Sequence, residues 1–220
     1  MFAEQFANVR TKSPLIHNIT NYVTVNDCAN MVLACGASPI MADDAAEVED
    51  ITTICGGLNI NIGTLNSRTI ESMLKAGKKA NALGHPVADR VTEENLDGAV
   101  AFAKAFAAKT GAVVAITGAI DIVADGAKAY CIRNGHPMMS AITGTGCQLS
   151  ALTAAFLTAN PSQPLEAAAA AVCAMGLAGE IAHARLTPLD GSATYRNYII
   201  DAIYHMTPAQ LEEGAKYEVR

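Results

Sequence analysis

Short stretches typical of strands alternate with longer helical ones along the chain. The strand-like stretches, which are either continuously apolar or alternating in polarity, lie at 14–20, 37–42, 57–63 and 112–119. Stretches with helical spacing of apolar residues lie at 26–36, 45–55, 147–159, 165–186 and 192–206. This alternation predicts an α/β fold, and the 220 residues suffice for a single domain over 1–220.

Two further helices are predicted by their apolar stripes. In the first, Ile70, Met73, Leu74 and Gly77 fall at helical spacing on one face. The second begins after Thr92, a residue type that caps helix N-termini well. Its apolar stripe consists of Leu96, Val100, Ala103 and Phe106.

Three local signals refine these elements. Gly36 is expected to end the helix 26–36, because glycine tolerates the left-handed backbone that often closes helices. The run 112–119 is continuously apolar, which predicts a strand buried on both faces. Residues 121–135 form two β-rich runs joined at Asp125-Gly126, which predicts a hairpin.

The alternation breaks at one place. Val87 looks like the start of a strand, but Ala88 leads at once into the next helix. A parallel sheet needs a strand between two such helices, and a strand–helix–strand unit takes roughly 30 residues or more. We therefore expect a segment to be missing between Val87 and Ala88. Omission from the sequence explains the break better than natural deletion, which would leave a hole in the sheet.

Composition and charge exclude several classes of function. A chain that is 51% hydrophobic and 16% charged is globular rather than disordered. Its formal net charge of −6 argues against nucleic acid as a partner. We expect no membrane span, because no run of 18 apolar residues is free of breaks, and the N-terminus lacks a signal-like apolar core. The six cysteines include no CxxC pair, so we expect reduced thiols in a cytoplasmic protein.

The stretch MMSAITGTGCQLSALTAAF, residues 138–156, holds the first candidate chemistry. Two glycines and Cys147 come directly before a helix. Bare backbone N–H groups at a helix N-terminus bind anions, and glycine lets a phosphate approach closely. A simple turn would also explain the glycines. Cys147 has three interpretations: a covalent nucleophile, a weak base beside a substrate hydroxyl, or a small packing residue.

Other candidates lie at the expected ends of strands, where ligands bind in open α/β sheets. Thr117 either donates to a nucleotide phosphate or simply forms a turn. Met41 either lines an apolar pocket or belongs to the core. The acidic group after the second strand suggests a metal site, but helix capping is the more ordinary explanation. Its members are Asp43, Asp44 and Glu47.

Five segments in order carry a resemblance to a known family. They are PLIHNITNYV, LACGASPIMADDAAE, LNINIGTL, AITGAID and TGTGC. Together they resemble hydroxyethylthiazole kinases, the thiamine-salvage members of the ribokinase-like superfamily. The resemblance covers almost the whole chain, on both sides of the Val87–Ala88 junction.

The resemblance implies a fold and a reaction. The fold would be a ribokinase-like, doubly wound, mostly parallel sheet flanked by helices. The reaction would transfer the γ-phosphoryl group of ATP, with Mg²⁺, to the hydroxyl of 5-(2-hydroxyethyl)-4-methylthiazole. The assembly would be a homotrimer with the site at the subunit interface.

The resemblance also implies roles for particular residues. Met41 and Gly144 would bind the thiazole, Thr117 would bind ATP phosphates, and Cys147 would stand where related sugar kinases keep an aspartate base. The family's ATP-binding arginine and Mg²⁺-binding acids belong to the segment expected at the junction, so no metal ligand is predicted in this chain. Two other functions remain open: a cysteine-dependent hydrolase or redox enzyme, and a thiazole-binding protein without catalysis.

Overall fold

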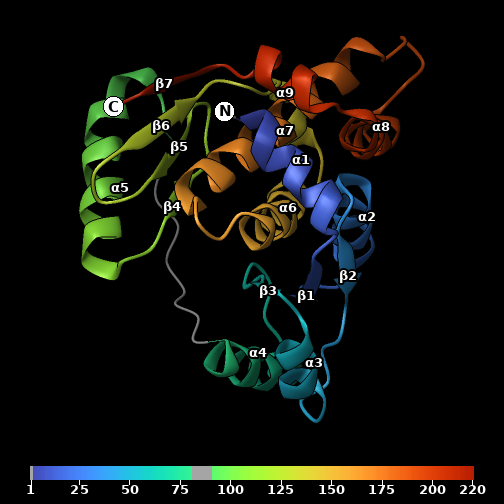
Figure 1. The fold of residues 1–220 in the computed structure, drawn as a ribbon. Helices are drawn as coiled ribbons and strands as arrows, with labels where there is room; N and C mark the ends of the chain where they lie inside the picture. Colours follow the sequence, from blue (N-terminus) through green and yellow to red (C-terminus); the bar gives the residue numbers. More distant parts are fainter. Residues whose placement is uncertain (1, 81–90) are drawn as a thin grey trace.

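The computed structural model describes residues 2–80 and 91–220 (Figure 1). The predicted junction between Val87 and Ala88 lies outside these residues. The elements, in chain order, are α1 (Phe2–Lys12), β1 (Leu15–Ile19), α2 (Val25–Cys35), β2 (Ser38–Ile40), α3 (Val48–Ile54), β3 (Gly57–Ile60), α4 (Ser67–Lys79), the 3-10 helix η1 (Glu93–Asn95), α5 (Leu96–Thr110), β4 (Val114–Ile116), β5 (Asp121–Ala124), β6 (Ala129–Ile132), the 3-10 helix η2 (Pro137–Ala141), α6 (Thr145–Ala159), α7 (Pro164–Ala184), α8 (Ser192–His205), α9 (Pro208–Gly214) and β7 (Tyr217–Val219).

A parallel sheet is formed by the N-terminal strands in the order β2-β1-β3. The central strand pairs with both neighbours, with Ile16 opposite Pro39 on one side and Gly57 on the other. Helix α6 packs against β1 and β3, and α3 and α4 pack against the same sheet from the opposite side in Figure 1. The carboxyl ends of the three strands therefore meet at one edge.

An antiparallel sheet follows, in the order β4-β5-β6-β7. The predicted hairpin is confirmed: Asp125 closes its turn by accepting hydrogen bonds from the backbone N–H groups of Ala127 and Lys128. The C-terminal strand β7 was not predicted from sequence, and it pairs with β6. Helix α5 packs against β4, β5 and β6, and α7 packs against β5 and β6.

The core centres on α7, which is rich in alanine and almost entirely buried. Its small side chains let α6, α8 and α1 approach closely. Helix α7 has the length and hydropathy of a membrane span, but 83% of the relevant window is buried inside the protein. The burial assigns it to the core. All six cysteines are free thiols, as expected, and Cys28, Cys35, Cys131 and Cys173 are buried.

The α/β class and the four predicted N-terminal and central strands are confirmed. Gly36 ends α2 with φ of 96°, and Thr92 and Asn95 form a capping box at the start of η1. The prediction of the apolar stripe of α5 was wrong at one position, because Ala107 rather than Phe106 is its fourth buried member.

Two predictions of burial were wrong in the region around the junction. Strand β4 is not buried on both faces, because Ala115 is exposed. On α4, Met73 is buried, but Ile70 and Leu74 are 40% and 58% exposed. Ala115 and these two side chains of α4 are not covered by any described element.

Candidate active site

The glycine turn before α6 lies beside the loop that follows β1. Gly144 is the N-cap of α6 and has φ of 93°, a conformation that favours glycine. A Cβ at Gly144 would lie 2.5 Å from Thr24 Cγ2, whereas a Cβ at Gly146 would meet nothing within 4 Å. The first residue thus needs to be glycine for the turn and for close packing. The second leaves open space in front of the helix.

The first backbone N–H groups of α6 have no capping side chain. Gln148 is the first residue of this turn to donate a backbone hydrogen bond within the helix, to the Gly144 carbonyl at 2.9 Å. The N–H groups of Thr145, Gly146 and Cys147 precede it, and Gly144 has no side chain to accept from them. This geometry suits an anion, because the helix dipole and free donors act together.

A chain of polar side chains leads to the Cys147 thiol. Asn61 Nδ2 donates to Thr20 Oγ1 at 3.0 Å, and Thr20 Oγ1 lies 3.2 Å from Thr24 Oγ1. Thr24 Oγ1 donates to Asn21 Oδ1 at 3.2 Å, and Asn21 Nδ2 points at Cys147 Sγ at 4.0 Å. Since each hydroxyl has one proton, Thr20 is the donor to Thr24. The donors therefore run in one direction, which orients every group along the chain.

The surroundings of Cys147 do not include an obvious base. Its described side-chain partner is the Asn21 amide, which is neutral. The neighbouring Cys28 is buried, and burial raises its pKa to about 11, so it stays a thiol at neutral pH. His136 stacks on His183 with ring centroids 3.5 Å apart, and no hydrogen bond among the described residues joins it to Cys147. A Cys–His nucleophile is therefore not formed.

The loop after β2 carries Met41 and is held in place by a buried histidine. Met41 is half-buried and packs against the main core. The next residue, Ala42, accepts a hydrogen bond at 2.9 Å from His17 Nε2, which must donate because a carbonyl only accepts. His17 is buried, and burial lowers its pKa, so the ring is neutral at pH 7. Its other nitrogen lies 3.0 Å from Thr52 Oγ1.

Arg68 connects three segments at the rim of the site. Its guanidinium donates to both carboxylate oxygens of Asp43, at 2.8 and 2.6 Å, and to the Tyr22 hydroxyl at 2.7 Å. Asp43 lies two residues after Met41, and Tyr22 is next to Asn21. This clamp on α4 thus fixes the loop after β2 relative to the loop after β1.

The acidic group after β2 does not form a metal centre. Asp43 binds Arg68, and Asp44 Oδ1 accepts from the Ala46 backbone N–H at 2.8 Å. Over residues 2–80 and 91–220, no three His, Cys, Asp or Glu side chains gather closely enough to hold a metal ion. The described residues thus offer no preformed all-protein cage for a metal ion, and we derive no catalytic step through one.

Thr117 lies apart from the other predicted residues. It is exposed on the loop between β4 and β5, in the second sheet. There the Gly118 N–H donates to Asp121 Oδ1 at 2.9 Å, and a Cβ at Gly118 would lie 2.8 Å from the Val91 backbone nitrogen. Burial raises the pKa of Asp121 to about 6. Within the described part of the chain, no hydrogen bond joins Thr117 to the glycine turn.

The structure thus brings some predicted site residues to one edge and separates another. Gly144 and Cys147 lie beside the β1 loop, and Met41 follows the adjacent strand β2. The sequence analysis missed Asn21, Thr24 and Arg68. The first two had a signal, because Asn- and Thr-rich sequence directly after a buried strand places polar groups at the ligand-binding edge. Arg68 had none, since its partners are distant in sequence.

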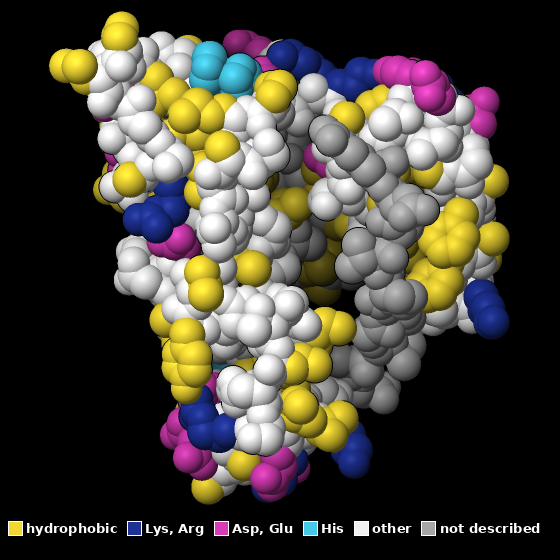
Figure 2. Space-filling model, turned by 180° about the vertical axis from the view of Figure 1, so that it is seen from behind, with side chains coloured by type: hydrophobic (Ala, Val, Ile, Leu, Met, Phe, Trp, Pro, Cys, Tyr) yellow, Lys and Arg dark blue, Asp and Glu magenta, His cyan; other side chains and the backbone are white. Residues whose placement is uncertain are grey.

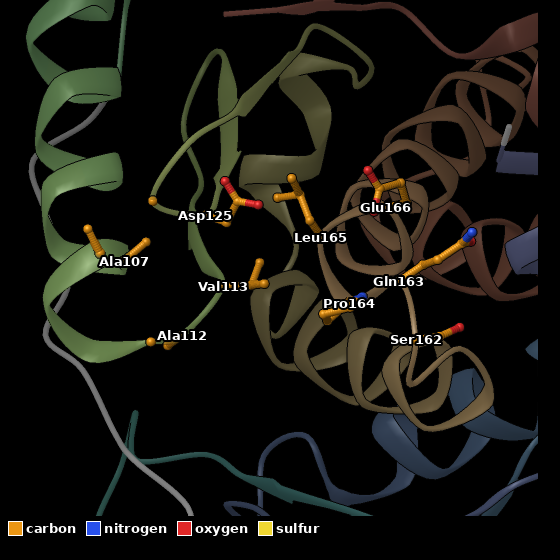
Figure 3. A pocket seen from close by; sticks show the side chains of 12 residues that line it. Ala107, Ala112, Val113, Asp125, Ser162, Gln163, Pro164, Leu165 and Glu166 are labelled. Carbon is orange, nitrogen blue, oxygen red and sulfur yellow. The ribbon is translucent and has the colours of Figure 1, made fainter.

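A cavity of about 480 Å³ lies elsewhere, between the end of α5, the β5–β6 turn and the start of α7 (Figure 3). Its two acidic side chains already have partners within the protein. Asp125 accepts two backbone N–H groups, and Glu166 accepts from Lys128 at 2.6 Å. None of the predicted site residues lines this cavity.

Comparison with known proteins identifies the family. The model of the hydroxyethylthiazole kinase family matches residues 6–92 and 89–209. The chain belongs to the hydroxyethylthiazole kinase family. The family match comes in two parts that meet at residues 89–92, next to the junction where the sequence pattern breaks.

Relatives of this family match over nearly their full length. A hydroxyethylthiazole kinase of Clostridium acetobutylicum is 52% identical over 271 positions, covering 99% of each chain. Another, of Desulfovibrio desulfuricans, is 41% identical over 264 positions, covering 92% of this chain and 93% of its own. The structure of a hydroxyethylthiazole kinase protein from Pyrococcus horikoshii OT3 has a TM-score of 0.88 at 31% identity, covering 100% of this chain and 98% of its own.

Proposed function

We propose that this chain serves the phosphorylation of 5-(2-hydroxyethyl)-4-methylthiazole by ATP, in the salvage of thiamine. The observation that carries the proposal is the uncapped glycine turn of Gly144–Gly146, set beside a side-chain hydrogen-bond chain that ends at Cys147. Family membership supports the reaction, because the relatives carry the name of this kinase.

The glycine turn would hold the transferring phosphoryl group. The N–H groups that precede Gln148 would donate to its oxygens, and the open space at Gly146 would admit them. Phosphoryl transfer passes through a loose transition state, so positioning and charge stabilisation matter more than a strong base. Mg²⁺ would neutralise phosphate charge when bound, held by substrate phosphates together with one or two carboxylates.

Cys147 would lie next to the substrate hydroxyl and position it. The Asn21 amide, with Nδ2 4.0 Å from the sulfur, would help to orient the thiol. A neutral thiol is a weaker base than a carboxylate, so we expect a slow kinase. Met41 would contact the thiazole ring, since a thioether adapts to flat aromatic ligands. Thr117 would donate to ATP phosphates from the second sheet.

A homotrimer with the site at its interface also belongs to the proposal. The loop after β1 and helix α2 present large apolar side chains to solvent, with Val23 68% and Leu33 55% exposed. Exposed apolar groups next to a site are typical of subunit contacts. Function in the cytoplasm would suit the free thiols.

The proposal is tested by calorimetric titration with the thiazole alcohol and by release of ADP from Mg·ATP. We expect binding of the alcohol, and of the analogue that has an ethyl group in place of the hydroxyethyl group. Only the alcohol can accept a phosphoryl group, so the analogue is the control for any ADP release. A chain that neither binds the alcohol nor releases ADP in response to it would contradict the proposal.

A second candidate is binding of the thiazole alcohol without transfer. It is favoured by the break in the sequence pattern at the Val87–Ala88 junction, next to which the family match divides. The two candidates differ in ADP release and agree in binding.

A further inference from the structure

We infer that Asn61 is a positioning residue for the proposed reaction, because it fixes the direction of the hydrogen-bond chain that ends at Cys147. In that direction the Asn21 amide presents its N–H groups to the sulfur, and the thiol proton is left to donate to the oxygen of the substrate alcohol. This inference rests on the proposed function and assigns the thiol the role of a hydrogen-bond donor.

The direction of the chain is set at its far end, by the side chain of Asn61. The Gly63 backbone N–H donates to Asn61 Oδ1 at 3.0 Å, so this atom must be the oxygen of the amide and the other one its nitrogen. Asn61 Nδ2 then donates to Thr20 Oγ1 at 3.0 Å. A chain that ran the other way would point the Thr20 proton at this NH2 group, and two donors would face each other. Asn61 therefore admits only one direction.

Two buried threonines carry this direction through the interior. Thr20 and Thr24 are 6% and 2% exposed, so water has little access to their hydroxyl groups. Thr20 donates to Thr24, and Thr24 donates to Asn21 Oδ1, at 3.2 Å in both cases. Cys28 also interacts with both hydroxyls, but burial raises its pKa to about 11, and its neutral sulfur accepts more weakly than an amide oxygen. The proton of Thr24 thus goes to Asn21.

At the near end of the chain, the Cys147 thiol has a proton to donate. Asn21 Nδ2 points at its sulfur at 4.0 Å, so the S–H bond cannot be directed at Asn21 without two donors facing each other. Cys35 shows the contrast, because its thiol donates to the Val32 carbonyl at 3.1 Å. No acceptor in the described part of the chain takes the proton of Cys147, which is half-buried. Open space lies in front of the neighbouring Gly146.

A hydroxyl group that enters this space accepts a hydrogen bond from the thiol. Its oxygen has two lone pairs, so that one accepts from S–H while the other attacks phosphorus. As the O–P bond forms and the bond to ADP breaks, the alcohol's own proton passes to an oxygen of the transferred phosphoryl group. The thiol keeps its proton, so Cys147 acts as a donor and not as a base.

Every side chain of the hydrogen-bond chain is neutral. On the face shown in Figure 2, Lys, Arg, Asp and Glu side chains likewise lie mainly at the margins of the molecule, and apolar and uncharged groups surround the hollow in its middle. Where charges are sparse and water is scarce, hydrogen bonds between neutral groups decide how a bound group is oriented. One direction of the chain thus gives the thiol one orientation.

The variant Asn61→Asp tests the inference, because a carboxylate only accepts. One of its oxygens keeps the bond from the Gly63 N–H, and the other takes the proton of Thr20. Thr24 then donates to Thr20, and the Asn21 amide turns its oxygen towards the thiol. We expect kcat for alcohol-dependent ADP release to fall about tenfold, the effect of one hydrogen bond, with little change in the affinity for the alcohol measured by calorimetry. An unchanged kcat would overturn the inference.

A double-mutant cycle with Cys147→Ala separates this role from an effect of the added charge. If Asn61 acts through the thiol, Asn61→Asp should cost nothing further in the Cys147→Ala background. An equal loss in both backgrounds would overturn the inference and leave the proposed function standing. Asn66→Asp is the matched control, because Asn66 Oδ1 also accepts a backbone N–H, that of Thr69 at 3.0 Å, but lies outside the hydrogen-bond chain. It should leave kcat unchanged.

The infrared S–H stretching band of Cys147, identified by its loss in Cys147→Ala, reports on the thiol proton and needs only binding. In the native protein, the thiazole alcohol should lower its frequency, and the ethyl analogue, which lacks the oxygen, should not. In Asn61→Asp, the frequency should already be low and should change little with the alcohol. Bound alcohol without a shift in the native protein would overturn the inference. Absence of both alcohol binding and ADP release would instead contradict the proposed function.

Discussion

At the scale of single residues, the side chains around Cys147 favour a positioning role for the thiol. The neutral Asn21 amide is its described side-chain partner, so no group activates it for covalent chemistry. We predict that Cys147→Ala keeps measurable ADP release and loses about tenfold to a hundredfold in kcat. Alcohol binding, measured by calorimetry, should change little. Complete loss of transfer with binding intact would contradict this role.

Arg68 gives a second prediction at the residue scale. Arg68→Gln removes the bidentate contact with Asp43 and the bond to Tyr22, so the loop bearing Met41 becomes free to shift. We expect affinity for the thiazole alcohol to fall roughly tenfold, because small displacements of binding groups are costly.

The control for Arg68 is Arg133→Gln. The Arg133 guanidinium also donates to both carboxylate oxygens of one residue, Glu93. Arg133 directly follows β6 of the second sheet, away from the Met41 loop. Its substitution should leave alcohol affinity unchanged. An equal loss in both variants would mean that Arg68 acts through general stability.

Asp121 gives a prediction about pH. Burial raises its folded pKa to about 6 from 3.8, so the folded state binds the proton more tightly than the unfolded state. The contribution of Asp121 to the free energy of unfolding is therefore lost as the pH rises from about 4 to about 6. Asp121→Asn keeps an acceptor for the Gly118 N–H and removes this loss. Urea unfolding should show the variant more stable at pH 7.5, by at most about 3 kcal/mol, and nearly equal at pH 4. An equal difference at both pH values would exclude ionisation as the cause.

At the scale of elements, the start of α6 depends on close packing against the β1 loop. Gly144→Ala strains a backbone at φ of 93° and places a Cβ 2.5 Å from Thr24 Cγ2. We predict a loss of about 2 kcal/mol in urea unfolding.

Two further variants separate the effect of backbone strain at residue 144 from that of the close contact with Thr24. Thr24→Ser removes the Cγ2 methyl and keeps the hydroxyl, so it should partly rescue Gly144→Ala. Gly111→Ala is the control for strain alone, since Gly111 has φ of 71° and no atom within 4 Å of its Cβ position. Equal losses at Gly111 and Gly144, without rescue, would show that the contact with Thr24 is unimportant.

The sequence predicted helix ends and turns correctly where residues close together in the chain determine them. Gly36 ends α2 because of its backbone freedom, and the Asp125-Gly126 turn forms because Asp125 accepts nearby N–H groups. The sequence did not predict strand formation or burial where these depend on a segment distant in the chain. Strand β7 exists because β6 pairs with it, and Ile70 of α4 is exposed because no described element covers it.

At the scale of the whole molecule, the site combines loops from opposite parts of the chain. The sequence identified Gly144 and Met41 as candidates because each lies at the end of an element. It did not reveal that Thr24 fills the space above Gly144, or that Arg68 ties the two loops together, because these contacts arise from the fold. The roles of Met41, Thr117 and Cys147 stay predictions.

The location of the bound alcohol tests the account most directly. A ¹H–¹⁵N NMR titration of the native chain with 5-(2-hydroxyethyl)-4-methylthiazole reports on every backbone N–H group near the ligand. We predict shifts centred on Gly144–Cys147, Asn21 and Met41. Shifts confined to the cavity between α5 and α7, around Val113 and Leu165, or no shifts at saturating alcohol, would contradict the account.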